Sequence, residues 1–224
     1  MAPAAPGRVL WCSVTSAETS TMRISRHYVV EDYTLLTFTK ESDWGVAIRI
    51  LRDRFETRYL EHVRALLQRA TSGFAALAID VALVETLEQF RRGRRSTPRG
   101  DGTKYFKAFL TETRFGDHFT EETAGLFYRT IRCGLLHQGE ADESSRIKRG
   151  SRYPLVGLTR DGRGIIINAE LFHTELEAAI DDYLRLLASP AQSRAREAFQ
   201  RKMNYICRKE AQPAATEPVS RESE

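Results

Sequence analysis

The chain has 224 residues, and 34 basic against 30 acidic side chains leave a formal net charge of +4. This length suits one substantial domain with its own core. Hydrophobic residues at 42% and charged residues at 29% are ordinary for a globular protein, which argues against wholesale disorder and against a fibrous structure. The mild basic excess favours an anionic partner such as nucleic acid, but the chain is not a polycation.

Cysteine and histidine spacings exclude several classes of site. The three cysteines, Cys12, Cys133 and Cys207, lie far apart and show no CxxC or Cys/His ligand spacing. This argues against a disulfide framework and structural zinc, and it favours the reducing cytoplasm. The histidines form no ligand pattern either, and no glycine-rich phosphate loop is present, so we expect no metal and no cofactor. No run reaches the ~18 apolar residues that suggest a membrane-spanning helix.

The N-terminal part, residues 1–41, is predicted to be a flexible tail followed by a short extended segment. Its first 25 or so residues are rich in Ala, Pro, Ser and Thr and show no periodicity. Tyr28–Thr39 carries aromatic and β-branched residues, which suit a strand. Helical periodicity begins at Ser42-Asp43, where either residue can cap a helix, and continues to Leu67.

The next helical pattern, Phe74–Phe90, is so apolar that we expect it at the centre of a bundle. The basic cluster 91–95 and the breaker-rich Ser96–Gly102 predict a flexible, positive loop after it. Such a loop can follow a phosphate backbone, although a solvated run of charges is the alternative. The candidate RNA-binding residues are Arg91, Arg92, Arg94 and Arg95.

Further along, a short helix is expected over Lys104–Thr111, and Thr120 is a good cap for a helix that reaches Gln138. Acidic residues in its first turn have the right sign for the helix dipole. After a polar loop over 139–152, alternating apolar residues on either side of Asp161-Gly162 predict a β-hairpin over about 153–167.

The last predicted elements are two helices. Asn168 can cap an amphipathic helix that Pro190 ends, and a basic helix follows within 190–209. The tail at 210–224 is predicted to be disordered. Together the patterns predict a mainly α fold, an antiparallel helical bundle over 42–189 with a small β-hairpin insertion.

The helix that Thr120 caps ends in Arg132-Cys-Gly-Leu-Leu-His137, the one sequence pattern that indicates a catalytic site. Arginine is permanently charged, and its planar donor fork fits a phosphate. Histidine, with a usual pKa of about 6.5, exchanges a proton near neutral pH. Five positions along an ideal helix place two side chains roughly 140° apart. The two therefore share a site only if Gly134 distorts the helix, the long arginine wraps around, or two copies face each other.

With the apolar helix upstream, this Arg-x4-His pattern resembles the HEPN superfamily, over about Trp44 to Leu187. The resemblance implies a metal-independent endoribonuclease in which the ribose 2′-hydroxyl attacks the adjacent phosphate, leaving a 2′,3′-cyclic phosphate and a 5′-hydroxyl. It also implies a homodimer whose two motifs face each other across one cleft. Many relatives act in toxin–antitoxin or antiviral systems, so an antitoxin or defence partner is a further expectation.

Arg132 and His137 match the family motif, whereas Cys133 stands where the family often has a polar residue. Glu85 is the candidate for a third catalytic residue, because a carboxylate on so apolar a helix needs a partner. It either orients Arg132 or His137, or pairs with an arginine in a purely folding role. The alternatives to a nuclease are a catalytically silent RNA- or nucleotide-binding module and a protein-interaction subunit.

Overall fold

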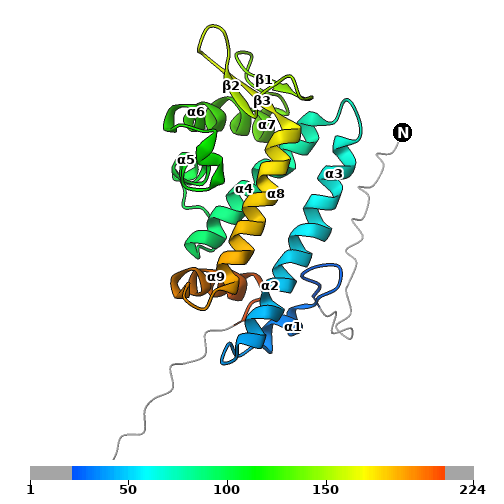
Figure 1. Cartoon of the computed structure of the whole chain (residues 1–224), viewed down its shortest axis with the longest axis vertical. Coiled ribbons are helices and arrows are strands. Elements are labelled where there is room, and N and C mark those ends of the chain that lie inside the picture. Colours follow the sequence, from blue (N-terminus) through cyan, green and yellow to red (C-terminus); the bar gives the residue numbers. More distant parts are fainter. Residues whose placement is uncertain (1–21, 210–224) are drawn as a thin grey trace, which may run out of the picture.

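The computed structural model describes residues 22–209, so the predicted tails at 1–21 and 210–224 lie outside the described residues. The described chain is mainly helical with a small three-stranded sheet, which confirms the predicted fold class of a mainly α protein with a small β insertion. Long helices run side by side, and the sheet covers one end of them (Figure 1).

The first long helix is confirmed, but it begins without the predicted cap. Its parts are α2 (Glu41–Phe55), the π-helical turn η1 (Glu56–Leu60) and α3 (Glu61–Leu67). The residue at the N-cap is Lys40, whose side chain makes no capping bond. Asp43 lies inside the helix, where its carboxylate accepts the backbone N–H groups of Thr37 and Phe38. It therefore holds the preceding turn in place and does not cap α2.

The predicted extended segment at 28–39 is wrong in part, because α1 (Val30–Thr34) forms there. The carboxylate of Asp32 accepts the backbone N–H of Val29 at 2.8 Å and so stabilises the first turn. Tyr33 is fully buried against the bundle. Local capping and burial of one aromatic ring outweigh the β-branched composition that indicated a strand.

The centre of the bundle consists of α4 (Gly73–Arg92), α8 (Ala169–Ala188) and α9 (Ser193–Ile206). Helices α4 and α8 run alongside each other (Figure 1). The side chain of Asn168 accepts the N–H groups of the first turn of α8, which confirms the predicted cap. Phe199 of α9 stacks on Phe90 of α4 at 6.1 Å and is fully buried. The C-terminal helix is therefore part of the core.

A second layer carries the Arg-x4-His pattern. Its elements are α5 (Gly102–Glu112), the 3-10 turn η2 (Arg114–Asp117), α6 (Glu121–Leu126), the π-helical turn η3 (Phe127–Arg132) and α7 (Cys133–Gln138). The Thr120 hydroxyl accepts the N–H of Thr123, so the predicted cap is confirmed. Phe127 stacks on Phe172 of α8 at 5.2 Å, which fixes this layer on the central helices.

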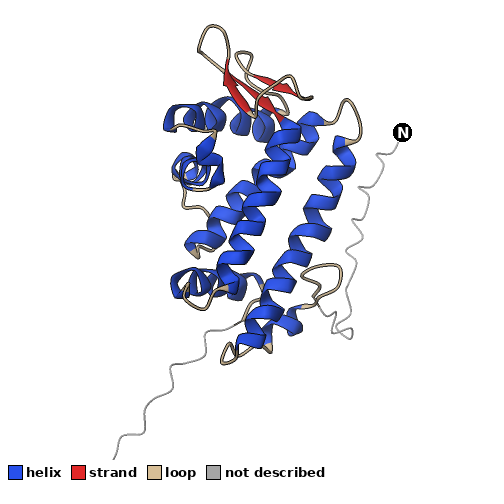
Figure 2. Ribbon diagram, viewed as in Figure 1, coloured by secondary structure: helices blue, strands red, loops and turns tan. Residues whose placement is uncertain are grey.

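The sheet contains one strand more than the predicted hairpin. Strands β2 (Val156–Leu158) and β3 (Ile165–Asn168) pair antiparallel, which confirms the hairpin. The added strand, β1 (Arg146–Lys148), lies in the predicted loop and pairs parallel with β3. Three residues are too few to show alternation, so no pattern indicated it. Figure 2 shows the sheet packed across the end of the bundle.

Candidate active site around Arg132

Arg132 and Glu85, two of the three predicted catalytic residues, meet between α4 and the helix that carries the motif. A guanidinium nitrogen of Arg132 donates to a carboxylate oxygen of Glu85 at 2.8 Å. The side chains are 15% and 22% exposed, respectively, so the pair lies at the edge of the core. Burial is the largest single influence and opposes the charged form of Arg132, but the hydrogen bond and the charge of Glu85, together with Tyr128 and Cys133, outweigh it and hold the pKa of Arg132 above its usual value.

Aromatic rings support the same guanidinium. Its carbon lies 5.3 Å from the ring centre of Tyr128 and 5.7 Å from that of Phe106. These distances are typical of cation–π contact, which favours a fixed charged group. The Nε of Arg132 is buried and has no hydrogen-bond partner among the described residues. Tyr128 precedes Arg132 by four residues, so helical spacing could have identified this contact from sequence.

His137, the third predicted residue, lies apart from this pair. It is exposed in the last turn of α7, and Gly139 in the left-handed conformation (φ 68°) ends the helix. Within residues 22–209, no hydrogen bond or ion pair joins its ring to Arg132 or Glu85. The segment Cys133–Gln138 is α-helical, so Gly134 does not distort the helix to bring the two groups together.

Gly134 has a different role, which is to let the returning chain pass close to the helix. A Cβ built on Gly134 lies 2.3 Å from the carbonyl oxygen of Glu140, too close for any side chain. The same loop is held by the N–H of Asp142, which donates to the carbonyl of Thr130 at 2.8 Å. The hydroxyl of Ser145 donates to that of Thr130 at 2.8 Å. These bonds join the π-helical turn η3 to the loop that leads into β1.

The predicted basic loop is shorter than expected, because α4 continues to Arg92. Both Arg91 and Arg92 bind the carboxylate of Glu88 at 2.5 Å, and Glu88 is only 1% exposed. A buried carboxylate that requires two partners draws these arginines into the helix. Arg94 and Arg95 are exposed after it, and the Arg95 guanidinium lies 5.6 Å from the ring centre of Tyr205.

A buried pair that sequence reasoning missed joins Asp80 of α4 to His173 of α8. The His173 Nδ1 lies 3.0 Å from a carboxylate oxygen of Asp80, and both side chains are at most 3% exposed. Burial raises the pKa of Asp80 despite this contact. Glu177 lies 3.5 Å from the other ring nitrogen. Asp80 and His173 are far apart in sequence, so only the fold brings them together. The buried contact indicates a structural role for His173.

Within the described part of the chain, no cluster of three or more His, Cys, Asp or Glu side chains has a geometry that could hold a metal ion. No helix there is both long and apolar enough to cross a bilayer. Comparisons of the chain with protein-family models, with curated proteins and with solved structures found no match.

Proposed function

We propose that the protein is a metal-independent endoribonuclease of the HEPN type, with Arg132 and His137 in its active site. The observation that carries the proposal is an oriented guanidinium at the end of η3, about 1.4 turns before an exposed imidazole in α7, which continues η3. Glu85 and the Tyr128 ring fix the orientation of the guanidinium. The His137 side chain is exposed, so a substrate can reach its imidazole.

RNA cleavage of this kind needs proton transfer and stabilisation of negative charge on the phosphate, and histidine and arginine can supply them. A neutral His137 would take the proton of a ribose 2′-hydroxyl, whose oxygen then attacks the adjacent phosphorus. The bond to the 5′-oxygen breaks, and that oxygen receives a proton, leaving a 2′,3′-cyclic phosphate and a 5′-hydroxyl. Arg132 would stabilise the negative charge that grows on the non-bridging oxygens. Glu85 touches no substrate in this scheme and acts as a positioning residue for Arg132.

A homodimer could bring Arg132 and His137 to the same phosphate, which one copy of the helix does not do. Five residues of α-helix separate the two side chains by roughly 140°, so one helix alone does not aim both at one phosphate. Two copies related by a two-fold axis would place the arginine of each near the histidine of the other. A second imidazole would also supply the proton that the 5′-oxygen requires. We extend the proposal to such a dimer, and to an antitoxin or defence partner that controls it.

The test is cleavage of end-labelled RNA in excess EDTA by the wild-type protein and by His137→Ala. We expect cleavage with cyclic-phosphate ends, and a loss of at least about a hundredfold in the variant. His62→Ala is the matched control, because His62 is also an exposed helical histidine but lies on α3. Equal cleavage by wild type and His137→Ala, or cleavage that EDTA abolishes, would overturn the assignment.

One observation favours a second candidate, an RNA-binding module that does not cleave. Arg94 and Arg95 are exposed after α4, where they can contact a phosphate backbone without taking part in cleavage. Retention of RNA without cleavage, weakened by Arg94→Gln, would favour this module. A protein that neither retains nor cleaves RNA would favour a protein-interaction subunit.

A further inference from the structure

A basic surface lies where α9 packs across the C-terminal end of α4 (Figure 1). Gly93 ends α4 in the left-handed conformation (φ 62°), and a Cβ on it would lie 2.7 Å from the Cα of Ala198. Only glycine allows so close an approach in that conformation. The loop that follows α4 therefore settles against α9 and brings Arg95 beside it.

Three side chains meet at this place, and we call them the Tyr205 surface: Arg95, Lys202 and Tyr205. The Lys202 ammonium donates to the carbonyl of Arg95 and to the side-chain oxygen of Gln89, both at 2.7 Å. It lies 5.7 Å from the ring centre of Tyr205, and the Arg95 guanidinium carbon lies 5.6 Å from the same point. Lys202 is only 5% exposed, whereas Tyr205 is 51% exposed. A buried lysine thus supports an exposed aromatic ring and an exposed arginine.

The positive charge of the Tyr205 surface is not neutralised. Within residues 22–209, neither Arg95 nor Lys202 forms an ion pair with a carboxylate. The single carboxylate of α9, Glu197, lies about 12 Å before Tyr205 along the helix and faces Arg201 at 3.8 Å. Burial and the nearby charge of Arg54 both lower the pKa of Lys202. A cation whose charged neighbour is another cation indicates a positive potential, which an anionic partner would relieve.

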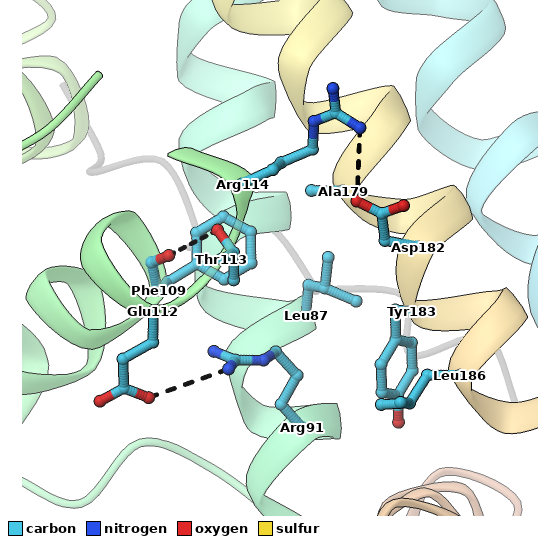
Figure 3. A pocket seen from close by; sticks show the side chains of 10 residues that line it. All are labelled: Leu87, Arg91, Phe109, Glu112, Thr113, Arg114, Ala179, Asp182, Tyr183 and Leu186. Atoms are coloured by element: carbon cyan, nitrogen blue, oxygen red, sulfur yellow. Dashed lines mark hydrogen bonds and ion pairs between the residues drawn. The ribbon is translucent and has the colours of Figure 1, made fainter. Parts of the chain in front are cut away.

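Arginines on the neighbouring pocket between α4, α5 and α8 differ in this respect. Figure 3 shows Arg91 directed toward the carboxylate of Glu112. It also shows Arg114 directed toward that of Asp182. These arginines have acidic partners within the fold, whereas Arg95 is available to a partner from outside.

The Tyr205 surface lies on the same face of α4 as the candidate active site. Gln89 follows Glu85 by four residues, so their side chains are neighbours on one face of the helix. Glu85 binds Arg132, and Gln89 binds Lys202. Helix α4 ends about 10 Å beyond Glu85. A strand of RNA held at Arg132 therefore reaches the Tyr205 surface by following α4.

We infer that the Tyr205 surface binds single-stranded RNA to one side of the bond that is cleaved. Arg95 contacts a phosphate, and the Tyr205 ring stacks on a base. Positive charge combined with exposed aromatic rings is how proteins hold single strands of varied sequence. A duplex keeps its bases paired and stacked, so it offers none to Tyr205. The position of the cleaved bond rests on the proposed function, but the binding itself requires no cleavage.

Fluorescence anisotropy of the full chain with a labelled 2′-O-methyl RNA strand measures binding without cleavage, because the methyl group blocks the attacking hydroxyl. We expect the single strand to bind about tenfold more tightly, or better, than a duplex of the same sequence. Polyglutamate of similar length tests for general attraction of anions and should bind more weakly by a similar factor. A duplex or polyglutamate that binds as tightly as the single strand would overturn the inference.

Tyr205→Ala removes the ring and should weaken binding of the single strand by about tenfold, the effect of one stacked base. Tyr205→Phe is the matched control, because it keeps the ring and should bind like the wild type. Unchanged binding by Tyr205→Ala would overturn the inference even if the wild type cleaves RNA. Binding that depends on Tyr205, in a protein that does not cleave RNA, would support the surface and refute the nuclease.

The contact of Arg95 with a phosphate is tested by the salt dependence of the same binding. Arg95→Gln should reduce the slope of log affinity against log salt concentration by about 0.7, the value for one phosphate of a single strand. Arg185→Gln is the matched control, since Arg185 is an exposed arginine of α8 that pairs with Asp182. An equal change of slope in the two variants would contradict a specific contact at Arg95.

Discussion

Helix α4 carries two carboxylates that meet basic groups of other helices in opposite surroundings. Asp80 pairs with His173 where both side chains are at most 3% exposed. Glu85 pairs with Arg132 where the side chains are 22% and 15% exposed. The first pair is sealed between α4 and α8, whereas the second lies within reach of solvent. The difference shows that one helix can carry one charged contact sealed inside the core and another at the edge of the core.

The different burial of the two pairs also gives them different pKa shifts. Burial raises the pKa of Asp80, so the carboxylate is costly to ionise despite its histidine partner. At the edge of the core, burial is again the largest influence, but the hydrogen bond and charge of Glu85 with the smaller effects of Tyr128 and Cys133 together raise the pKa of Arg132. A buried pair is therefore expected to matter for stability, and the accessible pair for binding and chemistry.

The largest expected effect is that of breaking the sealed pair. Asp80→Ala removes the partner of His173 Nδ1 and leaves a small cavity, which should lower the free energy of unfolding by about 3 kcal/mol. Urea denaturation measures this directly. Glu85→Ala, five residues along the same helix, is the comparison and should cost clearly less. Equal losses for the two variants would contradict the distinction between the pairs.

Close backbone packing next to the accessible pair is tested by Gly134→Ala. The new Cβ would lie 2.3 Å from the Glu140 carbonyl, so the returning loop must shift, at a cost of about 2 kcal/mol. Gly45→Ala is the matched control, since the nearest atom to its Cβ is a side-chain nitrogen of Arg49 at 3.6 Å. That variant should be neutral or slightly stabilising, because alanine favours helix. A neutral Gly134→Ala would show that the loop yields easily.

The sealed pair also predicts a pH dependence of stability. The pKa of Asp80 is higher in the folded protein than in the unfolded chain, so the folded state holds its proton more tightly. Stability should therefore fall as the pH rises above about 3.9, by at most about 1.4 kcal/mol for each pKa unit of difference. Denaturation of wild type and Asp80→Asn from pH 4 to 7 measures it. The wild type should lose stability relative to Asp80→Asn, and parallel curves would contradict the assignment.

Much of the fold could be predicted from sequence, because the signals were local. Thr120 and Asn168 cap their helices as predicted, and the Asp161-Gly162 segment joins the strands of the hairpin. The extended segment predicted at 28–39 was wrong in part, because the Asp32 carboxylate stabilises the first turn of a short helix over Val30–Thr34. β1 was missed, since its partner β3 follows about twenty residues later and three residues carry no pattern.

In the candidate site too, some contacts could be predicted from the sequence and others could not. A carboxylate on an apolar helix needs a partner, and that argument predicted a basic partner for Glu85 but left Arg132, His137 and another arginine open. The structure pairs Glu85 with Arg132. The pair of Asp80 with His173 depends on how α4 and α8 pack, which no spacing shows. Arg91 and Glu88 stand at helical i,i+3 spacing, and their pairing was missed because the helix was predicted to end at Phe90. Whether Arg132 and His137 meet across two copies depends on a surface contact, and periodicity within one chain does not specify it.

The smallest expected effect on stability is that of changing Glu85 in the accessible pair. This change tests whether Glu85 orients Arg132 or only stabilises the fold. Glu85→Gln keeps the shape and one acceptor but removes the charge, so the free energy of unfolding should change by less than about 1 kcal/mol. Because Arg132 then loses its orienting carboxylate, RNA cleavage should fall by tenfold or more, chiefly in kcat, with cleavage partly recovered in Glu85→Asp. Kinetics of RNA cleavage beside urea denaturation of the same samples makes the comparison. A large loss of stability with unchanged kcat would make Glu85 a folding residue like Asp80, and the contrast between the two pairs would disappear.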